Sequence, residues 1–159
     1  MSAPQLLSAL AAVALLSACA SEPETAAATG AGGAGASSGI RPGSQEDLRA
    51  NVGDRIFFAT DRSTVAPDQR SVLTRQATWM GTNASVQVTL EGHADERGTR
   101  EYNLALGQRR ANAARDVLVA SGVAGSRIQT VSYGKDRPEA LGSDETAWAQ
   151  NRRAVTVVR

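Results

Sequence analysis

The residue types that could do chemistry are concentrated in one stretch, Glu91–Gly98, which reads EGHADERG. A zinc site needs three or four ligands at fixed spacings, and the chain has a single histidine and a single, distant cysteine. General acid–base catalysis would need a nucleophile or a paired carboxylate as a partner, and none is apparent. We therefore expect no metal, no cofactor and no enzymatic activity. We expect His93 to be a structural, hydrogen-bonded loop residue.

This stretch lies between a predicted strand and a predicted helix. Val86, Val88 and Leu90 alternate with polar residues, which is the period of a half-buried strand. Residues 93–100 are dense in charge and predict a loop. The helix is predicted to follow Asn103 as its N-cap. Steps of four, three and four predict its buried positions, which are Gly107, Ala111, Ala114 and Leu118.

This arrangement predicts a crevice in which an acidic and a basic side chain are held a few ångströms apart. Asp95 follows the carboxyl end of the strand, and Arg110 lies in the second turn of the helix, so the two can grip a zwitterion. Arg109 and the pair Arg152–Arg153 could instead mark a nucleic-acid surface, but the net charge is only +1 and no aromatic residues are interleaved. We expect Arg110 and Arg152 to point toward the crevice, with Arg109 and Arg153 outside it or structural.

The other elements that position this crevice alternate between strand and helix over roughly 115 residues, the size of one domain. The predicted elements are a strand at Arg55–Phe58, a helix from Pro67 to Gly81, a strand at Arg127–Tyr133, a helical turn at Glu145–Gln150 and a strand at Ala154–Val158. The first helix has two possible inner stripes, namely Val72, Gln76 and Trp79 or Leu73, Ala77 and Met80. The pattern predicts an α/β (α+β) fold in which helices pack on a sheet.

The amino-terminal residues have a different character. Residues 1–19 contain an apolar run too short to span a bilayer, which ends in Leu16-Ser17-Ala18-Cys19 and resembles a bacterial lipoprotein signal peptide with its lipobox. Residues 1–5 carry no Lys or Arg, which is unusual for such a signal, and the alternative is a buried amino-terminal helix. We expect lipidation at Cys19, the only cysteine. Residues 20–45 are rich in Ala, Gly and Ser, a composition typical of a flexible tether.

Five ordered motifs resemble the OmpA-like peptidoglycan-binding domain over residues 46–159. They are Glu91–Gly98, Tyr102-Asn103, Arg109–Ala113, Val131–Lys135 and Asn151–Val155. The resemblance implies a mixed four-stranded sheet. It also implies a ligand, the diaminopimelate of peptidoglycan stem peptides, whose free end carries an ammonium and a carboxylate on one carbon.

The resemblance also implies roles for individual residues. Asp95 would take the ammonium and Arg110 the carboxylate, with Ala94, Asn103 and Arg152 at further contact positions. The position of Ala59 departs from the family pattern, because many relatives have an aspartate there. Asp61 is near enough in sequence to replace that aspartate, but its direction is not fixed by the sequence.

At the level of the cell, the resemblance implies a lipid-anchored protein of the outer membrane that faces the periplasm and tethers that membrane to the cell wall. The implied partners are peptidoglycan, the outer-membrane lipid leaflet and a TolB-like periplasmic propeller protein, in a system that supports envelope integrity and cell division. The alternatives are a cell-wall-active enzyme and an OmpA-like module of a stator or secretion complex.

Overall fold

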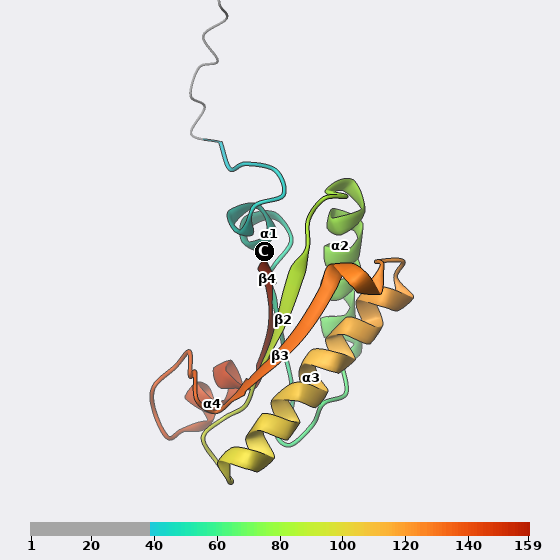
Figure 1. Ribbon diagram of the computed structural model, residues 1–159. Helices are drawn as coiled ribbons and strands as arrows, with labels where there is room; N and C mark the ends of the chain where they lie inside the picture. Colours follow the sequence, from blue (N-terminus) through green and yellow to red (C-terminus); the bar gives the residue numbers. More distant parts are fainter. Residues whose placement is uncertain (1–38) are drawn as a thin grey trace, which may run out of the picture. The chain divides into compact units, whose positions relative to one another are not determined.

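The computed structural model describes residues 39–159 (Figure 1), so the predicted signal peptide, Cys19 and most of the tether lie outside the described residues. The last tether residues, Ser44 and Gln45, are the N-cap and the first residue of a helix. The elements in chain order are α1 (Gln45–Asn51), β1 (Arg55–Phe57), α2 (Pro67–Thr82), β2 (Val88–His93), α3 (Arg100–Ala120), the 3₁₀ turn η1 (Gly125–Arg127), β3 (Ile128–Gly134), α4 (Glu145–Asn151) and β4 (Arg153–Val158). No helix among them is both long and apolar enough to cross a membrane.

The four strands form one mixed sheet in the order β1-β4-β2-β3, as the family resemblance implies. β4 runs antiparallel to both of its neighbours, whereas β2 and β3 are parallel. A parallel pair needs a long crossover connection, and α3 supplies it. α2 and α3 lie side by side against one face of the sheet, and α1 and α4 lie at opposite ends of the strands (Figure 1).

The core lies between the sheet and these two helices. Val88 and Leu90 alternate inward from β2, as predicted, whereas Val86 precedes the strand and is only half-buried. On α2 the second of the two predicted stripes is fully inside, and it is widened by Gln76 and Trp79. Gln76 is satisfied there because its amide donates to the Gly53 carbonyl and its oxygen accepts from the Thr156 hydroxyl at 2.7 Å.

The predicted spacing on α3 places small residues where the helix meets the sheet. Ala111, Ala114 and Leu118 are buried, and Gly107 lies directly over Gly92 of β2. A Cβ added at Gly92 would lie 1.8 Å from the Gly107 carbonyl oxygen, which no real contact allows. This close approach holds α3 against the strand whose end carries Asp95.

Two sequence predictions about local structure are wrong. Asn103 is not the N-cap of α3, because the Thr99 hydroxyl accepts from the Tyr102 amide and the helix begins at Arg100, leaving Asn103 inside its first turn. His93 is not in a loop, because β2 continues through it. The sequence reading also missed α1, which is capped by Ser44 and buries only Leu48.

Candidate functional site

The candidate site is built at the carboxyl end of β2, where the chain turns through residues 94–99 into α3. The turn is held to the end of β3 because the Ala94 amide donates to the Gly134 carbonyl at 2.8 Å. The Lys135 ammonium donates to the carbonyls of Glu96 and Gly98 and fixes the turn from the side. Gly98 adopts a positive φ of 86°, which allows the chain to reverse before the Thr99 cap. Asp95 is thereby held in one position.

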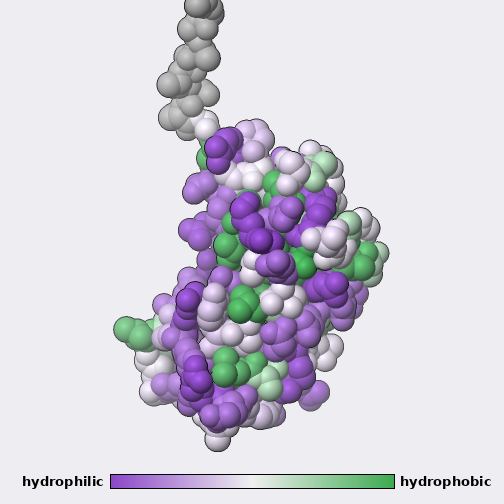
Figure 2. All heavy atoms as spheres, viewed as in Figure 1, coloured by the Kyte–Doolittle hydropathy of each residue, from purple (hydrophilic) through white to green (hydrophobic). Residues whose placement is uncertain are grey.

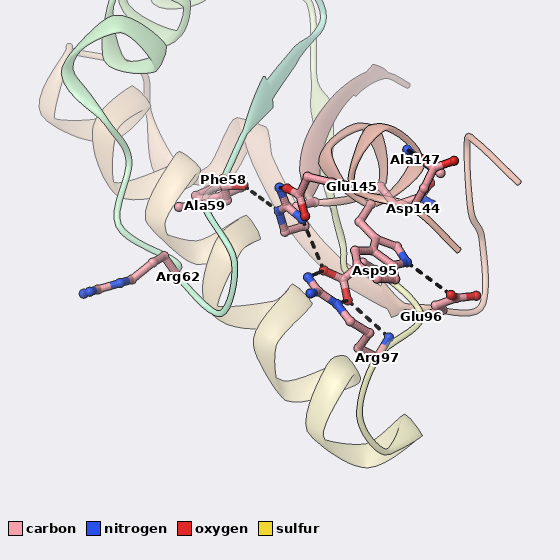
Figure 3. Close-up of polar contacts among 12 residues, drawn as sticks. Phe58, Ala59, Arg62, Asp95, Glu96, Arg97, Asp144, Glu145 and Ala147 are labelled. Atoms are coloured by element: carbon pink, nitrogen blue, oxygen red, sulfur yellow. Dashed lines mark hydrogen bonds and ion pairs between the residues drawn. The ribbon is translucent and has the colours of Figure 1, made fainter. Parts of the chain in front are cut away.

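Asp95 is 8% exposed, and its carboxylate lies between two guanidinium groups. Arg97 donates to it from its backbone amide and from two side-chain nitrogens, Nε at 3.1 Å and Nη2 at 2.6 Å. Arg152 Nη1 lies 3.5 Å from its Oδ2 atom. Figure 3 shows the Asp95 carboxylate pointing toward the Arg97 side chain. Burial alone would raise the pKa of Asp95, but the hydrogen bonds from Arg97 outweigh it and hold the pKa below its usual value.

Asp95 lines a surface pocket of about 340 Å³. The other lining residues are Thr60, Asp61, Arg97, Gly98, Tyr102, Asn103 and Leu106. Asp61 therefore points into the same pocket as Asp95, which the sequence alone left open. Its φ of 55° lies in the left-handed region, and its carboxylate accepts from the Tyr102 hydroxyl. The pocket thus carries two carboxylates and one lining cation, Arg97.

Arg110 is fully buried beside this pocket and is absent from its lining. Its three guanidinium nitrogens each donate to a backbone carbonyl, those of Ala59, Arg62 and His93, at 2.8 to 3.2 Å. Burial lowers the pKa of Arg110 to about 10, so the side chain stays protonated at neutral pH. Two of these carbonyls belong to the segment that carries Asp61, so Arg110 braces one wall of the pocket.

Arg152 joins α4 to the segments that directly follow β1 and β2. Its Nε donates to the Phe58 carbonyl, and its Nη2 lies 2.5 Å from a carboxylate oxygen of Glu145 (Figure 3). The side chain is only 7% exposed. Of the predicted contact positions, Asn103 lines the pocket and donates to the Arg97 carbonyl, whereas Ala94 is buried behind the turn.

Arg109 and Arg153 lie outside the pocket lining, as predicted. Arg109 is exposed and stacks near the Tyr102 ring, at 5.8 Å from its centroid. Arg153 is buried on the other side of β4, with its Nε 3.1 Å from Glu139.

His93 is buried, but the prediction that it is hydrogen-bonded is wrong. Neither ring nitrogen has a hydrogen-bond partner among the described residues, and the nearest carboxylate oxygen, from Glu91, is 3.7 Å away. Burial, aided by the charge of Arg153, lowers the pKa of His93 to about 4, so the ring is neutral at physiological pH. Within residues 39–159 no group of three His, Cys, Asp or Glu side chains is placed to hold a metal ion.

A family model described as the OmpA family matches residues 57–152, which is more than half of the chain. The chain belongs to the OmpA family. Curated relatives match this chain over more residues than the family model does. A protein of Mesorhizobium japonicum named peptidoglycan-associated lipoprotein is 54% identical over 152 residues, covering 94% of this chain and 89% of its own length. A Pseudomonas aeruginosa protein of the same name is 48% identical over 124 residues, covering 76% of this chain and 72% of its own.

Solved structures give the same fold. The crystal structure of the peptidoglycan-associated lipoprotein from Burkholderia pseudomallei matches with a TM-score of 0.67 and 38% identity, over 71% of this chain and all of that one. The C-terminal domain of Helicobacter pylori MotB matches with a TM-score of 0.63 at 20% identity, over 67% of this chain and 84% of that domain, and this likeness concerns the fold alone.

Proposed function

We propose that this protein is a non-enzymatic lipoprotein of the outer membrane that binds peptidoglycan without a covalent bond and thereby ties the membrane to the cell wall. The observation that carries the proposal is the pocket at the end of β2, in which two carboxylates, Asp61 and Asp95, lie next to arginines. Relatives named peptidoglycan-associated lipoprotein that match along most of the chain support it.

The proposed ligand is the free amino-acid end of diaminopimelate in stem peptides. Its ammonium pairs with Asp95, and Asp61, which faces the same pocket, supplies a second carboxylate where the family aspartate is replaced by Ala59. Its carboxylate is assigned to Arg110, through the N–H groups that the three carbonyls leave available. Because Arg110 is fully buried, the ligand reaches it only when the segment of Ala59 and Arg62 that covers it is displaced. Ala94, Asn103 and Arg152 complete the contacts from the turn, α3 and the end of α4.

Anchoring is proposed to depend on acyl chains on Cys19, followed by the tether of residues 20–45. A single acyl chain binds a membrane only marginally, whereas two or more hold a protein there stably. A coil of about 25 residues has a typical reach of roughly 25–30 Å, so the domain can search the cell wall beside its membrane. In this setting the proposed protein partner is a TolB-like propeller protein, in the system that supports envelope constriction.

One experiment distinguishes peptidoglycan binding from catalysis. The full-length protein is incubated with purified peptidoglycan and with soluble muropeptides, then sedimented, and the muropeptides are separated by chromatography. Co-sedimentation with unchanged muropeptides is expected. New muropeptide products would make the protein an enzyme, and failure to sediment would overturn the proposed function.

The anchor has its own test, because Cys19 is the only cysteine available for acylation. Cys19→Ser is expected to leave the protein unlipidated and released from outer-membrane fractions after the cell wall has been digested. Persistence of the variant in the outer membrane under these conditions would contradict the lipoprotein assignment.

A further inference from the structure

In the free protein the proposed ammonium partner already has a partner. Asp95 accepts two side-chain hydrogen bonds from Arg97, one on each carboxylate oxygen, in the forked geometry that makes arginine–carboxylate pairs strong. The two carboxylate oxygens can accept about four hydrogen bonds in all. Arg97 already supplies two to Oδ1 and one to Oδ2, and Arg152 Nη1 faces Oδ2 at 3.5 Å, so a ligand ammonium has to replace one of these donors. Binding at Asp95 therefore requires one of its two arginines to move.

The surroundings of the two arginines decide which one moves. Arg152 is 7% exposed, and Phe58 and Glu145 hold its remaining nitrogens. Arg97 is 40% exposed, and its Nη1 atom makes no hydrogen bond within residues 39–159. The backbone amide of Arg97 also donates to Asp95, so the carboxylate stays in place when the side chain leaves.

An aromatic ring lies against the Arg97 guanidinium beside the pocket. The guanidinium lies 4.0 Å from the centroid of the Trp148 ring, and cation–π contacts of this kind favour arginine. The ring is itself fixed, because Trp148 Nε1 donates to Glu96 at 3.1 Å (Figure 3). Arg97 is also the one cationic side chain among the residues that line the pocket, since Arg110 is buried beside it.

We propose that Arg97 exchanges partners when the ligand enters: the ligand ammonium takes its place on Asp95, and the ligand carboxylate takes the place of Asp95 on Arg97. This inference rests on the proposed function and adds to it a residue that sets specificity.

The exchange explains which ligands the pocket prefers. A lone ammonium breaks the Asp95–Arg97 pair and forms only one new pair, with Asp95. Arg97 is then left without a carboxylate partner, so binding of the lone ammonium is weak. An ammonium and a carboxylate on one carbon break one pair and form two. The pocket should therefore select the zwitterionic end of diaminopimelate over the lysine side chain, which ends in an ammonium alone.

The test compares two stem tetrapeptides that differ in this feature. The full-length protein in detergent is titrated calorimetrically with L-Ala-γ-D-Glu-meso-diaminopimelyl-D-Ala and with L-Ala-γ-D-Glu-L-Lys-D-Ala. Wild type is expected to prefer the first, and Arg97→Gln is expected to reduce that preference by about tenfold, equivalent to about 1.4 kcal/mol. The affinity for the lysine peptide should stay constant or rise, because Asp95 is no longer occupied.

Arg100→Gln is the matched control. Arg100 is also an exposed arginine paired with an aspartate, Asp136, but it lies outside the pocket lining. This variant should keep the wild-type preference. If Arg97→Gln keeps that preference too, or weakens both peptides equally, Arg97 only positions Asp95 and the exchange is overturned while the proposed function stands. If wild type binds neither peptide, the proposed function fails together with the exchange.

Discussion

Two buried aspartates in this protein have nearly the same neighbours and different surroundings. Asp54 is 3% exposed and lies 2.9 Å from Arg55 and 3.2 Å from Arg49, much as Asp95 lies between Arg97 and Arg152. Burial would raise the pKa of Asp54, but the hydrogen bond from Arg55 and its charge outweigh this and lower the pKa, as happens at Asp95. The charge composition alone does not distinguish the two sites.

The difference lies in what else the arginines bind. Arg55 also forms a salt bridge with Glu139 at 2.6 Å, and Glu139 forms one with Arg153 at 3.1 Å. The Asp54 cluster is therefore a chain of salt bridges that connects β1 to β4 and to the loop before α4. Among residues 39–159, Arg97 has no second carboxylate within salt-bridge distance, and it faces a pocket instead. A salt bridge whose arginine is held elsewhere supports the fold, whereas one whose arginine can be replaced is suited to bind a ligand. On the face drawn in Figure 2, apolar residues are scattered among hydrophilic ones.

The largest expected effect separates the two aspartates. Asp95→Ala should weaken peptidoglycan binding by well over tenfold, because an unpaired ligand charge in a partly buried site costs roughly 2–5 kcal/mol. Asp54→Ala should instead lower the free energy of unfolding by about 1.5–3 kcal/mol, the value of lost hydrogen bonds to charged groups, and leave binding unchanged. Peptidoglycan sedimentation and urea unfolding on the same preparations measure both quantities. Folded Asp95→Ala that sediments like wild type would remove Asp95 from the site.

Loss of Arg110 should reduce both peptidoglycan binding and the free energy of unfolding. Arg110→Ala leaves three carbonyls without their donor, and we expect a loss of about 2–4 kcal/mol in the free energy of unfolding together with a loss of binding. Arg109→Ala is the control, because that neighbour is exposed and its loss should change stability by no more than about 0.5 kcal/mol. Equal stability of the two variants in urea would show that Arg110 does not brace the wall that carries Asp61.

Between pH 7 and pH 5, the pH dependence of stability should come from His93. Its pKa is lowered from 6.5 to about 4, so the unfolded chain binds a proton at a pH where the folded protein does not. Stability is therefore lost as pH falls from 6.5 toward 4, by at most about 1.4 kcal/mol per pH unit. His93→Gln should lack the part of this slope that lies above about pH 5, which urea unfolding at several pH values between 7 and 5 will measure. Carboxyl groups whose pKa values are lowered, Asp54 and Asp95 among them, add losses that begin only near pH 5 and grow below it. Parallel slopes for wild type and variant would contradict the assignment.

The smallest effect is expected at Ala59, which is exposed at the end of β1 and whose carbonyl accepts from Arg110. Ala59→Asp adds the carboxylate that many relatives have, next to a pocket where Asp61 already faces the ligand. We expect binding of the diaminopimelate tetrapeptide to tighten slightly or to remain unchanged, within about threefold, which is less than 1 kcal/mol. A clear loss of affinity in titration calorimetry would place Ala59 wrongly relative to the pocket.

The sequence by itself determined the elements whose physics is local. The alternation at Val88 and Leu90 and the spacing of Gly107, Ala111 and Ala114 placed β2 and the inner face of α3, because periodicity alone reveals which face is buried. The ordered motifs pointed to the family and to its mixed sheet. Asp95 could be singled out because it follows a strand end directly.

Only the tertiary structure decided how the charged side chains are paired. The sequence does not distinguish three arginines that have different roles in the structure. Arg97 lines the pocket, Arg110 donates to backbone carbonyls, and Arg152 joins the segment after β1 to α4. Their partners lie up to 94 residues away in the chain, so no local pattern encodes them. The same holds for Asp61, whose direction depends on Tyr102 across the pocket. A charge is recognised in the sequence, but what it binds is set by which distant oxygens the fold brings within about 3 Å.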